Sequence, residues 1–419
     1  MADIPKIRFK GFTEPWEQRK LGEICSRVQG NDGRMELPTL TISAANGWMK
    51  QEDRFSGNIA GKEQKNYTLL HKGELSYNHG NSKLAKYGTV FSLQTYEEAL
   101  VPRVYHSFKV EIGSADFIEY YFATKMPDRE LRKLISSGAR MDGLLNIGYD
   151  DFMGIKMMFP SVLEQDKIAE YFRAFDHLIT LHQRKCDDTK ELKKYMLQKM
   201  FPKNGEKFPE IRFKGFTEAW EQRKVFDLLE LLTDYDANGS FADMAKNVNT
   251  TDGDGYAWYV RITDLENPKP LKELKYVDES SYKFLKKTEL HGGELLMAKR
   301  GDIGKVYIFE PRTKYATVAP NMYLLKLNNK VIPHFLYDYF VSNEGNKKLT
   351  RLNASSTMGA LYKDDVKNID VIMPSTEEQT MIGNFFQSID NLITLHQRKC
   401  DTLKELKKYM LQNMFPKKG

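Results

Sequence analysis

The chain contains the same sequence pattern twice, and this duplication constrains its fold more than any other feature. Residues 7–20 and 211–224 are identical but for one position, and residues 178–205 and 392–419 are nearly identical. The copies lie about half of the 419-residue chain apart. Solenoid repeats have periods of roughly 20–50 residues, so this is a duplication of whole domains.

The segments between the repeats differ strongly in sequence. We therefore interpret the repeated parts as framework and the variable parts as the places where the two halves do different jobs. One interpretation is a pseudo-twofold molecule that presents two related surfaces to an object of similar symmetry, such as a DNA duplex. The alternative is a tandem duplication without functional symmetry.

The two long repeats belong to predicted helices over residues 161–203 and 375–419. Glycine and proline are absent from 163–201, and 376–415 contains only Gly383. Apolar residues recur mostly three or four apart, which places them on one helical face. At 1.5 Å per residue each helix would be roughly 55 Å long. The residues predicted to pair the helices or to dock a partner are Phe172, Phe175, Ile179, Leu192 and Met196, with Phe386, Ile389, Ile393, Leu406 and Met410.

A helix with one apolar stripe needs a partner in water. We expect the two copies to pair as an antiparallel coiled coil, which would place one variable domain at each end. The alternative is that each helix packs on its own domain. The C-terminus could also precede the N-terminus in space, just as the first long repeat precedes residues 211–224 in sequence. This circular organisation suits neighbouring termini.

Short apolar runs and frequent glycines indicate a mixed α+β domain in each variable region. The first domain is predicted over residues 1–160 and the second over 204–374, and the short repeats 7–20 and 211–224 open them. The predicted fold is therefore two pseudo-twofold-related α+β domains separated by two long helices.

Loops of both variable domains carry residue types that suit DNA recognition. Asparagine and arginine can form bidentate contacts with adenine and guanine edges, whereas lysine and serine suit phosphates. For each residue, an ordinary solvated loop position is the alternative. The candidates in the first domain are Asn78, His79, Asn81, Ser82, Lys83, Lys86, Arg103 and Arg140. Those in the second are Arg261, Lys299, Arg300, Lys305, Asn321, Arg351 and Ser355.

Sequence signatures of an autonomous enzyme are missing. The chain lacks a P-loop, a dinucleotide-binding glycine loop, a zinc-protease helix motif and a nucleophile elbow. It also lacks the Asn-Pro-Pro-aromatic signature of amino-methyltransferases. The eight histidines do not cluster, and three cysteines without a Cys-x-x-Cys pair argue against a zinc site. With no apolar run long enough for a membrane span, we expect a non-catalytic protein of the reducing cytoplasm, with no metal and no membrane.

The whole chain resembles the specificity (S) subunit of a type I restriction–modification system. The resemblance rests on the duplicated layout of a variable domain followed by a long helix. It rests also on a local pattern that enters each helix, and on a glycine-containing loop of the second domain. These residues are Gly143–Ile147, Asp151-Phe152, Pro160 and Glu164-Gln165, then Asp365-Val366, Pro374 and Glu378-Gln379, and the loop Arg300–Gly304.

This resemblance implies that each variable region is a target-recognition domain that reads one half of a bipartite, asymmetric DNA site. The helices would set the gap between the half-sites and hold two adenine-methyltransferase (M) subunits. S-adenosylmethionine would be bound by those subunits, which flip the target base. ATP and Mg would belong to up to two motor and nuclease (R) subunits. This chain would bind no cofactor itself.

Two other functions remain open. A duplicated scaffold or adaptor would bind protein or glycan, whereas a DNA binder would show a salt-dependent affinity for duplex DNA. A stand-alone DNA-binding regulator would bind its site without a methyltransferase and would leave no methylated adenine.

Overall fold

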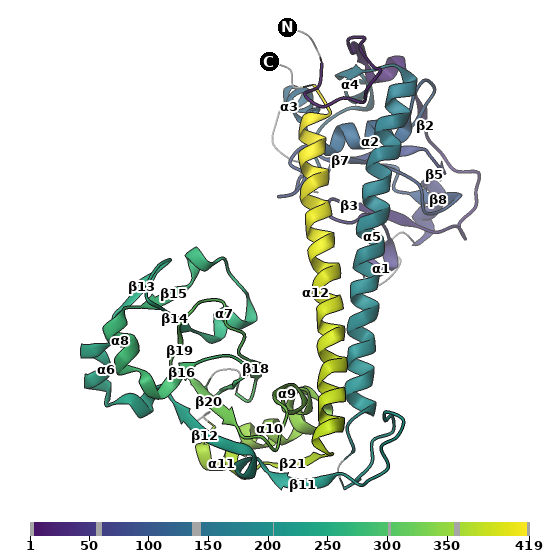
Figure 1. The fold of residues 1–419 in the computed structure, drawn as a ribbon. Coiled ribbons are helices and arrows are strands. Elements are labelled where there is room, and N and C mark those ends of the chain that lie inside the picture. The colour runs from purple at the N-terminus through teal and green to yellow at the C-terminus, as the bar shows by residue number, and fades with distance from the viewer. Residues whose placement is uncertain are drawn as a thin grey trace. The chain divides into compact units, whose positions relative to one another are not determined.

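The computed structural model describes residues 4–55, 61–135, 144–203, 205–300, 303–355 and 361–416. The chain forms two compact units: Met1–Gln183 together with Arg398–Gly419, and Arg184–Gln397. The boundary crosses both long helices. Each unit therefore contains one globular domain, the N-terminal half of one long helix and the C-terminal half of the other (Figure 1).

Both domains are built on the same four-stranded antiparallel sheet, with order β2-β9-β6-β7 in the first unit and β12-β20-β17-β18 in the second. The register opposes Tyr77 to His106 in the first sheet and Met297 to Tyr323 in the second. The strands are β2 (Cys25–Val28), β9 (His106–Val110), β6 (Leu75–Asn78), β7 (Thr89–Ser92), β12 (Leu229–Asp234), β20 (Met322–Leu327), β17 (Leu295–Ala298) and β18 (Val306–Ile308).

A second set of strands differs between the domains. The first unit has two antiparallel strand pairs, β3 with β4 and β5 with β8, joined by a parallel bridge from Thr39 to Leu100. The second unit has a five-stranded sheet of order β13-β15-β14-β19-β16, in which β14 and β19 are parallel. The strands are β3 (Leu40–Ser43), β4 (Gly47–Lys50), β5 (Thr68–His71), β8 (Glu98–Val101), β13 (Thr250–Asp252), β15 (Lys275–Val277), β14 (Ala257–Val260), β19 (Ala316–Val318) and β16 (Glu289–Leu290).

One helix packs into the core of each domain at the same place in the chain order. In α2 the Ser114 hydroxyl accepts a hydrogen bond from the Phe117 N–H and caps the helix. In α9 Pro333 occupies the first turn, where its fixed φ suits helix initiation. Phe117 and Phe335 are fully buried. The shorter helices are α1 (Gln51–Phe55), α2 (Ala115–Ala123), α3 (Asp128–Leu134), α4 (Tyr149–Met153), α6 (Phe241–Asn247), α7 (Ile262–Glu266), α8 (Glu279–Phe284), α9 (Pro333–Val341), α10 (Asn343–Ser355) and α11 (Lys363–Lys367).

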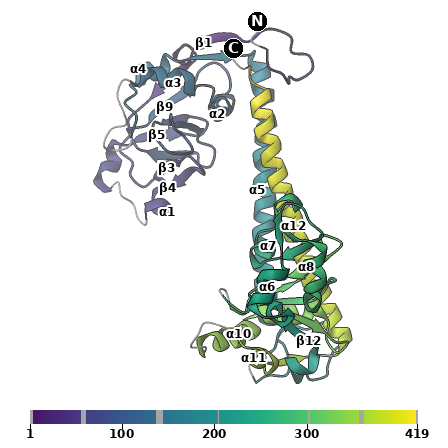
Figure 2. The same cartoon turned by 90° about the vertical axis from the view of Figure 1, so that its left-hand side faces the viewer.

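The two long helices are α5 (Val162–Lys199) and α12 (Thr376–Asn413), each of 38 residues. They pair antiparallel within each unit, as expected (Figures 1 and 2). In the first unit the Lys407 ammonium donates to the Asp176 carboxylate at 2.5 Å. In the second unit Lys193 donates to Asp390 at 2.7 Å.

The N-terminal part of each long helix also packs on its own domain. Ile168 and Phe172 of α5 are buried in the first core, and Ile382 and Phe386 of α12 in the second. Pairing of the helices and packing on the own domain, which were expected as alternatives, therefore both occur. None of the described helices is both long and apolar enough to cross a membrane.

The short repeats attach each domain to the start of its long helix. The strand β1 (Glu17–Lys20) pairs with β10 (Lys156–Phe159), and β11 (Glu221–Lys224) pairs with β21 (Asp370–Met373). The chain ends also meet as the circular pattern predicted. The Ile7 N–H donates to the Asn413 carbonyl at 2.9 Å, just as the Ile211 N–H donates to the Lys199 carbonyl at 2.9 Å.

A bidentate ion pair explains much of the identity of the short repeats. The Arg8 guanidinium donates two hydrogen bonds of 2.7 Å to the Glu164 carboxylate, whose side chain is 1% exposed. Arg212 forms the same pair with Glu378, with two bonds of 2.8 Å. Because the carboxylate is buried away from water, its negative charge is stabilised by this cation.

We expect Arg8→Ala to lower the free energy of unfolding by about 3 kcal/mol, because the Glu164 carboxylate would stay buried without its cation. Calorimetric unfolding of the purified chain measures this. Arg19→Ala is the matched control, because Arg19 and its partner Glu17 are exposed and such pairs contribute about 1 kcal/mol or less. Equal losses in the two variants would contradict the assigned role of Arg8.

One buried carboxyl distinguishes the two helix pairs. Asp338 of α9 is 2% exposed, and burial raises its pKa to about 8, with Lys193 opposing the shift. At the corresponding position of α2, the Tyr120 hydroxyl donates to Asp176 at 2.8 Å. The folded second unit therefore holds a protonated carboxyl where the first unit has a phenol.

The raised pKa of Asp338 makes stability depend on pH. Between about pH 4 and pH 8 the folded state binds this proton and the unfolded state releases it, so stability falls as pH rises, by up to about 1.4 kcal/mol per pH unit. We expect Asp338→Asn to flatten this slope and to be most stabilising at pH 8. Thermal unfolding from pH 5 to pH 8 tests it, with Asp364→Asn, an exposed carboxyl, as the control. An unchanged slope in Asp338→Asn would show that another group causes it.

Candidate nucleic-acid interface

Three segments of the first domain meet at the end of β6. They are the loop that starts at His79, the turn between β8 and β9, and the segment that precedes α4. The Leu145 N–H donates to the His79 carbonyl at 2.9 Å, and Gly80 forms a β-bridge with Leu144. The His79 ring contacts the Val104 and Leu145 carbonyl oxygens at 2.8 and 2.7 Å.

His79 is therefore not a DNA-contacting residue, contrary to the prediction. Its side chain is buried and both ring nitrogens are used inside the domain. Asn78 is engaged as well, because its amide donates to the Ile42 carbonyl at 3.2 Å and accepts from the Gly80 N–H at 3.0 Å. Both residues shape the loop, and neither is free to read a base.

The exposed residues of this junction are those that follow His79 and those of the adjacent turn. A tight turn with mutual backbone hydrogen bonds of 3.2 Å between Ser82 and Ala85 presents the loop. The predicted DNA contacts that are exposed on these segments are Asn81, Ser82, Lys83, Lys86 and Arg103. The predicted contact Arg140 lies outside the described residues.

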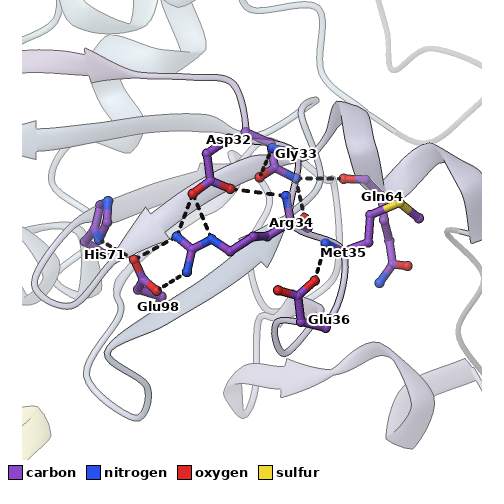
Figure 3. A network of polar contacts seen from close by, with 9 residues as sticks. Asp32, Gly33, Arg34, Met35, Glu36, Gln64, His71 and Glu98 are labelled. Atoms are coloured by element: carbon purple, nitrogen blue, oxygen red, sulfur yellow. Dashed lines mark hydrogen bonds and ion pairs between the residues drawn. The ribbon is translucent and has the colours of Figure 1, made fainter.

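Another arginine of the first domain is fully occupied. Arg34 donates to Asp32 and, through two nitrogens, to Glu98 of β8, while His71 lies 3.5 Å from the same carboxylate (Figure 3). The hydrogen bonds from Arg34 hold the pKa of the Glu98 carboxyl below its usual range. This network fastens the loop before β3 to the β5–β8 pair and leaves little capacity for a phosphate.

The second domain brings the same three segments together at the end of β17. The Lys299 N–H donates to the Asn321 carbonyl in the β19–β20 turn at 2.9 Å, and the Leu361 N–H donates to the Lys299 carbonyl at 3.0 Å. The Tyr323 hydroxyl donates to the Leu361 carbonyl at 2.7 Å. By register, Tyr323 occupies the place of His106.

The Lys299 side chain was also predicted to contact DNA, and this is wrong. It is 8% exposed, and its ammonium donates to Asp234 at 2.7 Å and to Asp236 at 2.6 Å. Lys363 binds the other oxygen of Asp234 at 2.9 Å. Burial would raise the pKa of the Asp234 carboxyl, but the hydrogen bonds from the two lysines outweigh it and lower that pKa.

The remaining candidates of the second domain are placed differently from one another. Arg300 and Asn321 are exposed beside the Lys299 junction, and Asn321 has a left-handed φ of 73°. Lys305 is exposed but donates to Glu266 at 2.7 Å. Arg261 lies at the N-cap of α7, where the Asp264 carboxylate accepts its backbone N–H and two hydrogen bonds from its guanidinium.

The last two candidates of this domain lie on α10. Arg351 lines a cavity of about 410 Å³ with Lys199 and Lys347, at the end of α5. Ser355 is the last residue of α10, and its side chain lies outside the described part of the chain.

Sequence reasoning missed the residues that assemble the junctions. Asp234, Leu145, Leu361 and Tyr323 are brought in from distant parts of the chain, and their local sequence carries no signal for this role. For His106 the sequence gives a weak indication that it lies near the predicted DNA contacts, because it begins the strand β9 immediately after the turn that contains Arg103.

The long helices bury most of the predicted pairing residues. Phe172, Phe175, Phe386 and Ile389 are buried, and Ile179, Met196, Ile393 and Met410 are half-buried. Leu192 and Leu406 are 48% and 43% exposed, so they do not pair the helices and remain candidates for docking a partner. At about 100° per residue, Leu192 lies roughly 120° around the helix from the buried Cys186, so it belongs to another face.

That other face forms a second apolar stripe on each helix. On α5, Leu178 and Leu192 are fourteen residues, or about four turns, apart and therefore lie in line. The exposed residues of the first unit are Leu178, Leu181, Leu406 and Tyr409; those of the second are Leu392, Leu395, Leu192 and Tyr195. We call these sets the first and second apolar patches. They consist of equivalent residues of the two long repeats, so each unit presents the same surface.

Comparison with known proteins finds similar sequences and structures. Residues 217–405 match the family model described as the type I restriction modification DNA specificity domain. A putative type I restriction enzyme MjaX specificity subunit of Methanocaldococcus jannaschii is 27% identical over 219 residues, covering 51% of this chain and 49% of that protein. The type I restriction enzyme MjaVIII specificity subunit of the same organism is 22% identical over 308 residues, covering 71% of this chain and 68% of that protein.

The second half of the chain is thus similar to the type I restriction modification DNA specificity domain, and both relatives are named as type I restriction enzyme specificity subunits. The match to the MjaX relative extends over about half of that protein's length. The fold is also seen in a crystal structure of the type I restriction–modification system S subunit from M. genitalium. That structure aligns with a TM-score of 0.61 at 13% identity, over 99% of this chain and 100% of the other.

Proposed function

We propose that this chain is the DNA sequence-specificity subunit of a type I restriction–modification complex, and that each domain reads one half of a bipartite, asymmetric site. The observation that carries the proposal is the loop junction that recurs in both domains on the same sheet. Its exposed side chains differ: Asn81, Lys83 and Arg103 in the first domain, and Arg300 and Asn321 in the second. Equal frameworks with different exposed polar residues suit two different base sequences.

The two apolar patches support two copies of one partner. Each patch combines residues from both long helices, and the patches are equivalent by sequence. We infer that they hold two methyltransferase subunits, which would bind S-adenosylmethionine and flip the target adenine. ATP and Mg would belong to a further motor and nuclease subunit. In this scheme the chain itself is non-catalytic and supplies sequence choice, and the paired helices set the gap between half-sites.

The decisive experiment is a genome-wide map of N6-methyladenine in the source cell with and without this gene. We expect a two-part motif that disappears on deletion. A chromosomal Arg300→Ala variant should relax one half of that motif and leave the other intact, because Arg300 is exposed on the second junction only. A bidentate arginine–guanine contact contributes about 1–3 kcal/mol of discrimination.

Other outcomes identify the alternatives. Identical methylation maps with and without the gene would overturn the proposal. Salt-dependent binding of the purified chain to duplex DNA, combined with identical maps, would indicate a stand-alone regulator. Binding without salt dependence would indicate a scaffold. Relaxation of both half-sites by Arg300→Ala would contradict the assignment of one half-site to each domain.

The patch assignment predicts stoichiometry. Replacing the first apolar patch by serines (Leu178→Ser, Leu181→Ser, Leu406→Ser, Tyr409→Ser) should remove one of two methyltransferase subunits, because the exposed apolar area that drives association is lost. Native mass spectrometry of the reconstituted complex counts the subunits. The matched control is the same replacement in the second patch, which should also leave one subunit. Retention of both subunits in each variant would show that the partners dock elsewhere.

A further inference from the structure

The two loop junctions are fastened by one residue each, at equivalent positions but with different chemistry. His79 directly follows strand β6, and Lys299 directly follows the equivalent strand β17. In the second domain Arg300 comes one residue after Lys299. Each accepts a backbone hydrogen bond from a leucine, Leu145 or Leu361, of the segment that returns to the junction. Both side chains are buried, at 6% and 8% exposure.

His79 has an unusual set of partners. Both of its ring nitrogens point at backbone carbonyl oxygens, Val104 at 2.8 Å and Leu145 at 2.7 Å. A carbonyl oxygen can only accept. A neutral imidazole has one N–H donor, whereas the imidazolium has two. Only the protonated ring can therefore satisfy both contacts.

The neighbouring histidine shows the contrasting case. His106 stacks on His79 with ring centroids 4.9 Å apart, and burial lowers its pKa to about 4, so it is neutral. It meets one carbonyl, that of Ile147, at 2.8 Å, and one N–H satisfies it. The other titratable groups of this cluster are Tyr77, which packs beside both rings, and Tyr149, which carries Arg27 over its face at 4.3 Å.

Lys299 fastens the second junction through different contacts. Its ammonium donates to the carboxylates of Asp234 and Asp236, and it lies 5.6 Å from the centre of the Tyr323 ring. Hydrogen bonds between an ammonium and carboxylates are charge-assisted and therefore stronger than those between neutral groups.

Resting on the function proposed above, we propose that His79 and Lys299 are the positioning residues of the two reading surfaces. His79 ties the loop with Asn81 and Lys83 to the turn with Arg103, and Lys299 ties Arg300 and the Asn321 turn to the end of β12. Loss of the His79 contacts therefore weakens recognition of the first half-site only, and loss of the Lys299 contacts weakens recognition of the second half-site only.

The test uses the reconstituted complex of this chain with its methyltransferase subunits. The substrates are duplexes with the mapped site, or with one base pair changed in either half. For each half, discrimination is the ratio of the methylation rate of the intact site to that of the changed site. His79→Leu should lower discrimination at the first half about tenfold. Lys299→Met should do the same at the second half only.

The half that is affected separates positioning from simple stability. A general loss of structure would lower discrimination at both halves, whereas the loss of one positioning residue acts on its own half. The amide in His79→Gln can still donate to one of the two carbonyl oxygens, so this variant should keep more first-half discrimination than His79→Leu. It also serves as the readout where His79→Leu does not fold.

Two results would overturn the proposal. One is first-half discrimination in His79→Leu that equals that of the unaltered complex. The other is equal loss at both halves in His79→Leu, as expected of a general loss of structure. If the unaltered complex itself ignores changes in both halves, the proposed function fails and this inference fails with it.

Discussion

Each domain core is completed by the end of the other long helix, and the rest of the architecture depends on this exchange. Met414 and Phe415, which follow α12, are buried in the first core, where the ring centroids of Phe415 and Trp16 are 5.9 Å apart. Met200 and Phe201, which follow α5, are buried in the second core. Neither domain can bury its apolar surface without the C-terminal half of the helix that starts in the other unit. Antiparallel pairing is therefore a condition for both cores.

The same exchange explains which sequences stayed alike after the duplication. The duplicated pairs, Arg8 with Glu164 and Arg212 with Glu378, join the short repeat to the first turn of a helix. A buried carboxylate tolerates no loss of its cation, so both partners must persist together. The cross-helix pairs of Asp176 with Lys407 and Asp390 with Lys193 have the same equivalence. Residues that hold the framework together are thus the same in both halves, whereas the exposed loop residues of the two domains differ.

Where the copies differ, they often solve one structural problem with different chemistry. A phenol at Tyr120 and a carboxyl at Asp338 occupy corresponding positions beside the helix pair. A histidine and a lysine occupy corresponding positions at the loop junctions. Such exchanges keep the backbone arrangement and change the side-chain contacts that hold it. A duplicated protein can in this way give its two halves different physical properties on a shared fold.

The sequence alone determined the duplication, the two long helices and the α+β class of the domains, because these follow from repeats and from apolar spacing along one chain segment. It favoured antiparallel pairing of the helices, but only the tertiary structure showed that each helix both pairs with the other and packs on its own domain. It also identified loops whose residue types suit DNA. Only the tertiary structure decided which of those residues are exposed. His79 and Lys299 look like polar loop residues in sequence, but carbonyls and carboxylates from distant segments enclose them. Leu192 fits the apolar spacing of a helix and is nevertheless exposed. Each long helix carries two apolar stripes, and the spacing alone does not identify which stripe the partner helix covers.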